Sequence, residues 1–294
     1  MNTHWSQYVQ TPDMLYRSRA VRFHDRNRDL WLEAIGAKGD MDILEIGCGP
    51  GLFTHRVKQY LPDARVTGLD LDDGFIAYSR EKASELALDC AYVQGDALAM
   101  PFADASFDLC YSHTVSEHLP IQPFLLEQRR VLRPGGRITV LSVRTNASLP
   151  DCGENGTTPE EAALWEKLNR AGEGKTPIPV CAHPMTESEF PLALEEAGFR
   201  EVDLRFFCVT YYAPDSSSVP PELALEQIEA DRICALEGLA VLTRLAPAAL
   251  HDGERQRLLT LVNARFDARV TSWRANEKRW DVTAKMILVA TGIR

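Results

Sequence analysis

Short apolar runs alternate with amphipathic segments along the first half of the chain. The apolar runs occupy residues 42–47, 64–70, 90–96, 107–112 and 137–143. Between them, as in DGFIAYSREKASELAL after the second run, apolar residues recur at helical spacing. Strands that alternate with helices predict βαβ units around a parallel sheet with both faces covered. We therefore predict that residues 37–144 form the core of an α/β domain.

The second half of the chain follows a different pattern. Residues 145–185 are rich in proline, glycine, asparagine and threonine and interrupt the alternation. A helix is predicted from the capping-box-like TESEF to about Ala197, and a strand follows at 201–212. Residues 220 to about 280 have apolar positions at helical spacing, and the chain ends with a strand-like run.

Composition and charge narrow the classes of function. The 294 residues include 42 acidic and 32 basic side chains, which gives a net charge of −10. Broad binding to a nucleic-acid backbone needs a surface rich in lysine and arginine, so we expect no nucleic-acid partner. Seven scattered cysteines without a CxxC motif, and an N-terminal stretch without an apolar core, predict a cytoplasmic protein. No apolar run approaches about 18 residues, so we expect no membrane span.

The strongest chemical signal is the sequence ILEIGCGPGLFT, which runs from Ile43 to Thr54. A buried strand enters a glycine-rich turn, and a helix pattern follows. Such a turn lets the backbone approach a ligand closely. A dinucleotide fingerprint, G-x-G-x-x-G, would require a glycine at Leu52, and Glu45 within the strand would repel an arriving pyrophosphate. We therefore expect the turn to bind a different cofactor.

Five motifs in order resemble those of the class I S-adenosylmethionine-dependent methyltransferases. LEIGCGPG is similar to the first motif of that family, and VTGLD, which ends at Asp70, is similar to the second. VQGDALAMPF resembles the third, FDLCYS the fourth strand, and VLRPGGRITVLS the turn into the fifth. The resemblance covers about 41–144 and is closest to the methyltransferase type 11-like group, which includes ubiquinone and menaquinone methyltransferases. It implies a Rossmann-like α/β fold with a doubly wound, mostly parallel seven-stranded sheet, an antiparallel last strand and helical cap insertions.

The resemblance also implies S-adenosylmethionine as the cofactor and S-adenosylhomocysteine as the product. Asp70 stands where the acidic residue of the family binds the ribose hydroxyls, and Asp96 and Ala97 stand at the adenine. A doubly wound sheet places the tip of the second strand beside the first turn, which supports Asp70 independently. The structural alternative for Asp70 is a helix N-cap. The expected cofactor-binding residues are Glu45, Gly47, Cys48, Gly49, Gly51, Asp70, Leu71, Asp96, Ala97, Ser112 and His113.

The methyl acceptor is expected to bind over the carboxyl ends of the parallel strands. Two insertions, 145–185 and 213–280, leave the core at that edge and are expected to form a cap with the N-terminal helical segment 1–36. With the core they would make one domain of 1–294 that accepts a small molecule. The candidate acceptor residues are Tyr16, Arg17, Arg144, Tyr211 and Tyr212, with Tyr8, Trp165 and His183 as further candidates. Each has a packing or surface role as its alternative, because aromatic side chains commonly fill cores.

The sequence YSHTVSEHLP places two histidines and a glutamate after the fourth predicted strand. The spacing H-x-x-x-E-H is one residue longer than the inverted zincin pattern and lacks an evident third ligand, so we expect no metal. His113 lies nearest the strand tip and is the leading candidate for contact with the cofactor or the acceptor. Glu117 and His118 are further catalytic candidates, and their alternative role is to shape the loop by hydrogen bonds. The catalytic residue itself stays open, because a base is needed only if the acceptor arrives protonated.

Three other interpretations remain open at the level of the sequence. Cys152 and Cys181 share one insertion, which leaves room for an arsenic or thiol methyltransferase on the same fold. A non-catalytic S-adenosylmethionine-binding module would be expected to lose the glycines or Asp70. An NAD-dependent oxidoreductase is disfavoured by the glycine pattern. The apolar helical stripe within 220–280 predicts either internal packing or a homodimer surface.

Overall fold

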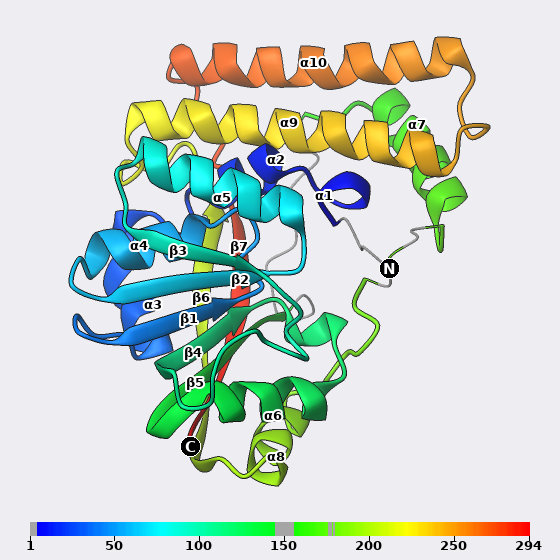
Figure 1. Cartoon of the computed structure of the whole chain (residues 1–294). Coiled ribbons are helices and arrows are strands. Elements are labelled where there is room, and N and C mark those ends of the chain that lie inside the picture. The colour runs from blue at the N-terminus through cyan, green and yellow to red at the C-terminus, as the bar shows by residue number, and fades with distance from the viewer. Residues whose placement is uncertain (1–4, 145–155, 176–177, 179) are drawn as a thin grey trace.

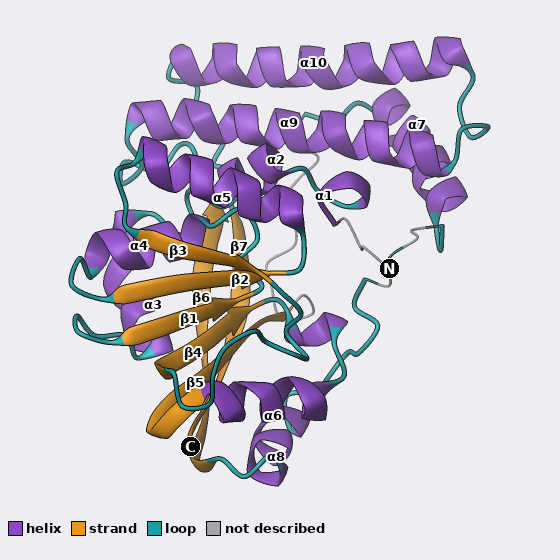
Figure 2. Cartoon of the chain, viewed as in Figure 1, coloured by secondary structure: helices purple, strands orange, loops and turns teal. Residues whose placement is uncertain are grey.

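A seven-stranded sheet organises the residues that the computed structural model describes, which are 5–144, 156–175, 178 and 180–294. The strands are β1 (Asp42–Ile46), β2 (Arg65–Asp70), β3 (Cys90–Gln94), β4 (Phe107–His113), β5 (Leu132–Arg144), β6 (Arg200–Tyr212) and β7 (Thr283–Ile293). Their order is β3-β2-β1-β4-β5-β7-β6 (Figure 2). Strands β1 to β5 pair in parallel, and β7 runs antiparallel to both of its neighbours. The predicted mostly parallel sheet with an antiparallel last strand is confirmed.

Helices cover both faces of the sheet (Figure 1). In chain order they are α1 (Trp5–Tyr8), α2 (Pro12–Arg17), α3 (Arg28–Ile35), α4 (Leu52–Tyr60), α5 (Asp73–Glu85), α6 (Ile121–Val131), α7 (Pro159–Gly172), α8 (Glu189–Glu196), α9 (Pro221–Leu245) and α10 (Asp252–Arg274). Two short 3-10 turns, Asp25–Asn27 and Ser116–His118, complete the set. Trp31 and Phe53 bring α3 and α4 onto one core, and Phe124 and Phe190 bring α6 and α8 onto the other.

The central strands are buried on both sides, as the continuous apolar runs indicate. On β4, Leu109 and Tyr111 pack with α3 and α4, whereas Cys110 packs with α6. Such double burial is the rule for parallel strands. The register pairs Ile46 at the end of β1 with Leu69 on β2 and with Ser112 on β4. The segments that follow β1, β2 and β4 therefore meet at one edge of the sheet.

Three helices form a further layer beside α5 and α2, at the top of Figure 1. Helices α9 and α10 run antiparallel, and α7 packs against both. Their shared core includes Leu168, Ile228, Leu258, Val262 and Phe266. We call these three helices the cap. The apolar residues of α10 pack against α7 and α9 of the same chain. A homodimer through these helices stays a prediction, and the apolar residues of α10 do not support it.

The N-terminal segment lies between the cap and the sheet edge. The Thr11 hydroxyl donates to Glu237 on α9 at 2.8 Å, and the Ser6 hydroxyl donates to Asp72 before α5 at 2.9 Å. The residues from Trp5 to Ile35 form short helices and turns, as the sequence predicts. No helix of the described part of the chain combines the length and the apolar character needed to cross a membrane.

The proline- and glycine-rich composition of 145–185 conceals helix α7, which the apolar pattern does not reveal. The signal that marks its start is the sequence TPEE: the Thr158 hydroxyl accepts a hydrogen bond from the backbone of Glu161 at 3.1 Å, and Pro159 occupies the first turn. The predicted helical stretch 220–280 is interrupted between α9 and α10 and ends at Arg274. Cys152 of the arsenic hypothesis lies outside the described residues.

Candidate functional site

The glycine-rich turn after β1 is hydrogen-bonded to the end of β2. The amides of Gly47 and Cys48 donate to the carbonyl of Leu69 at 2.8 and 3.0 Å, and the Gly49 amide donates to Asp70 at 2.8 Å. A phosphate-binding loop instead presents free amides to its ligand. The turn therefore offers a close-fitting backbone surface and not a phosphate cradle.

Steric constraints explain the glycines at both ends of this turn. Gly47 has φ of 68°, and a Cβ there would lie 2.3 Å from a methyl carbon of Val115. Gly51 has φ of 84°, and a Cβ there would lie 2.9 Å from the hydroxyl oxygens of Ser79 and Tyr92. Any L-residue would be strained in these conformations and would push away the loop after β4 or helix α5.

Asp70 ends β2 with its carboxylate directed back to the turn. Its two oxygens accept the amides of Gly49 at 2.8 Å and Asp72 at 2.9 Å. Burial raises its pKa to about 6. The helix N-cap alternative for Asp70 is wrong: the residue that caps α5 is Asp72, whose side chain accepts from Gly74 and Phe75. Asp70 therefore does not cap α5, and its carboxylate can also accept hydrogen bonds from a ligand.

The residues expected at the adenine lie close to Asp70. The Gly95 amide donates to the Asp70 carbonyl at 2.9 Å, which joins the end of β3 to the end of β2. Asp96 then turns back through a 2.8 Å hydrogen bond from Leu98, and Ala97 lies half-buried beside it. Leu71 is 48% exposed although it is apolar. The exposed side chain of Leu71 therefore offers an apolar surface against which a planar ring can pack.

Glu45 and Cys48 are enclosed by the protein. The Glu45 carboxyl accepts hydrogen bonds from the hydroxyls of Thr54 and Tyr111, the latter at 3.1 Å, and burial raises its pKa to about 8. Burial also raises the pKa of the Cys48 thiol well above its usual value, as expected for a small unreactive filler. Glu45 is therefore protonated at neutral pH and shapes the crevice.

The crevice between the turn and the N-terminal segment is narrow. Leu15, Arg19 and Phe23 line it from the N-terminal side, and Cys48 and His113 line it from the sheet. Its volume of about 20 Å³ holds about one water molecule. The N-terminal segment therefore closes over the turn at this edge. The sequence analysis does not single out Arg19 or Phe23; the only signal is a pair of arginines, three residues apart, in RAVRF.

His113 lies at the tip of β4 and is 6% exposed. Its ring contacts those of Phe23 and Trp31 at centroid distances of 5.6 and 5.7 Å. Burial, and then the charges of Arg22 and Arg19, hold the pKa of His113 well below its usual value. Its Nε2 atom is buried and has no hydrogen-bond partner among the described residues, and the same holds for the Ser112 hydroxyl. Sequence and structure thus agree that His113 faces the crevice.

Glu117 and His118 lie elsewhere, in the loop that follows. Glu117 accepts a hydrogen bond from the Ser142 hydroxyl through its carboxylate, and from the His183 amide through its carbonyl at 2.9 Å. His118 accepts from the Cys181 amide at 2.9 Å and contacts the Trp5 ring. Both residues connect this loop to the segment that precedes α8. These contacts correspond to the alternative role of Glu117 and His118, in which they shape the loop by hydrogen bonds.

The candidate acceptor residues separate into two groups. Tyr211 lies beneath the guanidinium of Arg22, with 3.6 Å between the guanidinium carbon and the ring centre. The Tyr16 hydroxyl lies 3.3 Å from Nδ1 of His55, which is buried between α4 and α5. Arg17 instead bonds Asp13 at 2.7 Å on the surface. The other five candidates also face away from the crevice.

Arg144 donates to the carbonyl of Met185 at 2.8 Å near α8. Tyr212 is buried among the charged groups of the cap, with Asp231 and Arg269 acting on its hydroxyl. Trp165 donates to Glu161 within α7 at 3.3 Å. Tyr8 is 42% exposed, and His183 is also exposed. The structure therefore brings only Tyr211 of these aromatic and basic candidates to the buried side of the crevice.

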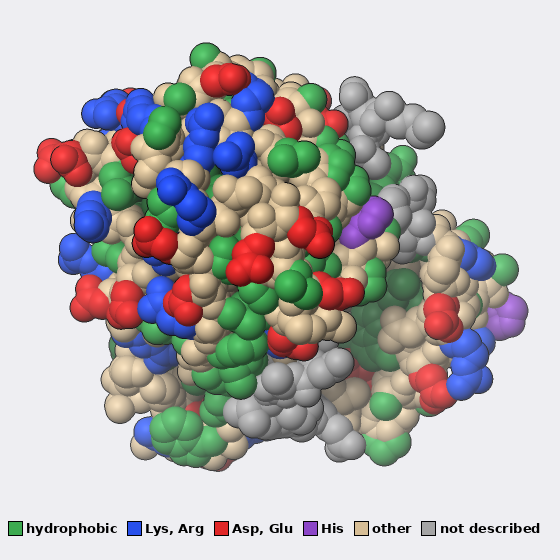
Figure 3. All heavy atoms as spheres, turned by 90° about the horizontal axis from the view of Figure 1, so that it is seen from below, with side chains coloured by type: hydrophobic (Ala, Val, Ile, Leu, Met, Phe, Trp, Pro, Cys, Tyr) green, Lys and Arg blue, Asp and Glu red, His purple; other side chains and the backbone are tan. Residues whose placement is uncertain are grey.

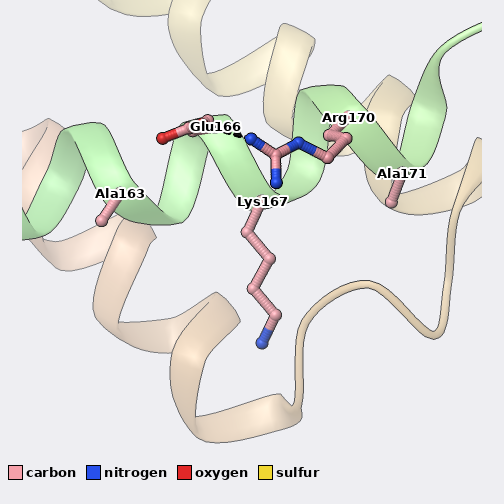
Figure 4. A pocket seen from close by; sticks show the side chains of 5 residues that line it. All are labelled: Ala163, Glu166, Lys167, Arg170 and Ala171. Atoms are coloured by element: carbon pink, nitrogen blue, oxygen red, sulfur yellow. Dashed lines mark hydrogen bonds and ion pairs between the residues drawn. The ribbon is translucent and has the colours of Figure 1, made fainter.

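A depression of about 350 Å³ lies far from this edge, on the outer face of α7. Figure 4 shows that its five lining residues come from that one helix, with Glu166 paired to Arg170 and Lys167 pointing away. It lacks the convergent buried polar groups of a binding site. Figure 3 shows that acidic and basic side chains are mixed over the face of the molecule seen from below. In the same view, a recess with hydrophobic side chains separates the main body from a smaller part at the right.

Comparisons with known proteins place this geometry in a family. The family model described as "Methyltransferase domain" matches residues 44–140. The chain is 30% identical over 206 residues to the malonyl-[acyl-carrier protein] O-methyltransferase of Erwinia pyrifoliae. The aligned region covers 67% of this chain and 68% of that protein. It is 35% identical over 130 residues to the demethylmenaquinone methyltransferase of Thermus thermophilus, over 44% of this chain and 54% of that protein.

A solved structure supports the fold across nearly the whole chain. Phosphoethanolamine N-methyltransferase 2 of Haemonchus contortus, in complex with S-adenosyl-L-methionine, superposes with a TM-score of 0.55 over 98% of this chain and 59% of that chain. At 15% identity this similarity shows the fold alone. The sequence relatives, the matched family model and the strand order agree with one another. The chain therefore belongs to the class I S-adenosylmethionine-dependent methyltransferases.

Proposed function

We propose that the chain transfers the methyl group of S-adenosylmethionine to a small-molecule acceptor by in-line displacement at the carboxyl edge of β1 and β4. The observation that carries this proposal is the meeting of Asp70, the glycine turn and His113 at that edge. The sulfonium of the cofactor supplies an electrophilic methyl group, so the protein has mainly to hold and align the two reactants.

Three features fit this cofactor. The carboxylate of Asp70 can accept hydrogen bonds from the ribose hydroxyls, and exposed Leu71 with Ala97 offers an apolar surface for the adenine. The turn from Gly47 to Gly51 lets the backbone approach without presenting free phosphate donors. Arg19, which lines the crevice, would face the carboxylate at the methionine end of the cofactor.

His113 is the proposed catalytic candidate. Its depressed pKa leaves the imidazole neutral at pH 7, and its unpartnered Nε2 faces the edge where an acceptor would lie. A neutral imidazole can accept the proton of an acceptor hydroxyl or amine as the methyl group moves. Glu117 and His118 are proposed to position the loop, and the cap with the N-terminal segment is proposed to enclose the acceptor within a single domain.

A ligand and turnover experiment tests the proposed function. In a thermal-shift assay, S-adenosylhomocysteine should stabilise the protein and NAD should not. In methyl transfer from radiolabelled S-adenosylmethionine to a panel of small acceptors, His113→Ala should lower kcat by at least about 100-fold, because general-base catalysis typically contributes that much. The melting temperature should also fall, because the substitution removes a buried ring, so turnover is compared at a temperature at which both proteins are folded.

The control for this experiment is His251→Asn, which keeps a capping side chain at the α9–α10 turn of the cap. It should retain parental turnover. Stabilisation by NAD alone would end the proposal. Turnover that His113→Ala leaves unchanged would return His113 to a packing role.

Cofactor affinity should depend on the ionisation of Asp70. The ribose hydroxyls need an ionised acceptor, so binding favours the carboxylate and lowers its pKa from the value of about 6 in the free protein. Affinity should therefore be fully present above pH 6 and fall by roughly tenfold per pH unit below it. Asp70→Asn should weaken S-adenosylhomocysteine binding by about 10- to 100-fold and remove the pH dependence.

Isothermal titration between pH 5 and pH 8 measures both effects. The matched control is Asp104→Asn, because Asp104 is an exposed acid that pairs with Arg130 away from the crevice. Its titration curve should follow that of the parent. Equal pH dependence in the parent and in Asp70→Asn would show that another group is responsible.

A further inference from the structure

Arg22 is a buried cation that pairs with no acidic side chain in the part of the chain that the structure describes. It lies in the turn between α2 and α3 and is 6% exposed. Its Nε and Nη1 atoms have no hydrogen-bond partner among the described residues, and no ion pair of Arg22 is found there. Its main contact is the face of the Tyr211 ring. The burial of a charged group in this state is costly unless a counter-charge arrives.

Two more polar atoms beside Arg22 are also unsatisfied. The hydroxyl of Tyr211 and Nε2 of His113 are both buried and unpartnered in the described part of the chain. Arg22 is the largest charged influence on His113, which places the two side chains close together. Tyr211 on β6 and His113 on β4 come from strands far apart in the sequence, and the N-terminal segment adds Arg22 over them. Polar groups from three elements thus converge on one region.

The charge of this region is positive. Burial lowers the pKa of Arg22 to about 9, so the guanidinium remains charged at neutral pH. Arg19 adds a second positive charge, and Glu45, the acid that acts on Arg19, is mostly protonated because its pKa is about 8. A trapped water molecule could satisfy a donor, but it carries no net charge. The region therefore favours anions.

We propose that Arg22, with Tyr211, binds a carboxylate group of the methyl acceptor beside the site of methyl transfer. This inference rests on the proposed function and names the class of its substrate. Arg19 faces the crevice and would neutralise the carboxylate of the cofactor, which leaves Arg22 as the one guanidinium of the cluster for a negative charge on the acceptor. A singly charged carboxylate matches this count, whereas a doubly charged phosphate exceeds it.

The surroundings of the cluster indicate what the rest of the acceptor is like. The rings of Phe23, Trp31 and Phe53 pack around His113, and Phe207 of β6 contacts Trp31. Planar guanidinium donors suit a carboxylate, and an aromatic wall suits an apolar body. The acceptor is thus a carboxylic acid whose remaining part is apolar.

Binding of simple probes to the protein saturated with S-adenosylhomocysteine tests this inference. Benzoate and hexanoate should raise the melting temperature, whereas the uncharged benzamide and hexanamide and inorganic phosphate should not. Arg22→Met should weaken benzoate binding by about 10- to 100-fold, the usual effect of losing a charged hydrogen-bond donor, and Tyr211→Phe by less. Both variants should keep the parental affinity for S-adenosylhomocysteine.

Stability separates a binding role of Arg22 from a structural one. Removal of an unpaired buried charge should leave the melting temperature of Arg22→Met unchanged or raised, whereas loss of a structural arginine would lower it. The control Arg26→Met removes an exposed arginine of the same segment, bonded to Ser218, and should bind benzoate like the parent.

Four results would overturn the inference: equal binding of acids and amides, no shift with either acid, a preference for phosphate, or unchanged benzoate binding by Arg22→Met. Failure of the parent to bind S-adenosylhomocysteine would instead contradict the proposed function. The two failures are therefore distinguishable.

Discussion

Gly47→Ala is expected to reduce S-adenosylhomocysteine affinity by about 30- to 4,000-fold. The positive φ of 68° costs an L-residue roughly 1–2 kcal/mol, and the new methyl group would lie 2.3 Å from Val115, an overlap that costs about 1–3 kcal/mol more. At 1.4 kcal/mol per tenfold, these penalties together give the stated range. The turn can relieve the overlap only by moving, and that movement changes the surface that receives the cofactor.

The matched control for this change is Gly39→Ala. Gly39 precedes β1, has no φ in the left-handed region, and an added Cβ there would meet nothing within 4 Å. Isothermal titration should show parental affinity for Gly39→Ala, and circular dichroism should show the same fold for both variants. Affinity within threefold of the parent in Gly47→Ala would contradict the close fit assigned to this turn.

Arg269→Met is expected to destabilise the chain by about 3–5 kcal/mol, because it breaks a buried ion network at the foot of the cap. Arg269 bonds Asp215 at 2.6 Å and pairs with Asp281 at 2.7 Å, and the side chains of Arg269 and Asp215 are 2% and 3% exposed. Methionine fills a similar volume but leaves two enclosed carboxylates without their cation. The melting temperature should fall on the order of 10 °C.

An exposed arginine of the same helix provides the comparison. Arg257 pairs with Glu160 on α7, and both side chains are about half exposed, so Arg257→Met should cost less than about 1 kcal/mol. Differential scanning calorimetry measures both variants. Equal melting temperatures for the two would show that the network contributes no more than a surface pair does.

The functional consequence of this network lies in its position. Asp215 lies shortly after the end of β6, and Trp273 of α10 donates to the carbonyl of Pro214 at 3.0 Å. The same strand end holds Tyr211, whose carbonyl accepts a hydrogen bond from Gln227 of α9 at 2.6 Å. Loosening the cap should therefore also disturb the proposed acceptor site, although no residue of the network contacts it.

Local patterns in the sequence are sufficient to predict the sheet and the cofactor edge. The alternation of apolar runs with helical segments reflects burial on both faces, which constrains each strand by its own residues. Gly47 and Gly51 are required by the positive φ of the backbone at their positions, and Asp70 is placed by its position at the end of β2. Both causes act over a few residues of the chain. His113 was predictable for the same reason, since it ends a strand beside them.

The directions of the candidate side chains outside the cofactor edge depend on tertiary contacts, which the sequence pattern does not reveal. Arg17 and Arg19 are two residues apart, yet Asp13 holds the first on the surface and the second lines the crevice. Tyr211 and Tyr212 are neighbours, and the alternation of a strand sends one to Arg22 and the other to the cap.

The sequence by itself determined the α/β class, the glycine turn, the acid at the second strand and the family, because each depends on residues close together in the chain. The tertiary structure decided that Glu117 and His118 brace a loop and that α7 packs on α9 and α10. It also decided that Arg22, His113 and Tyr211 converge with no acidic side chain paired to Arg22 among the described residues. The physical reason is that burial and charge pairing depend on segments up to about 200 residues apart. Only the folded chain brings those segments together.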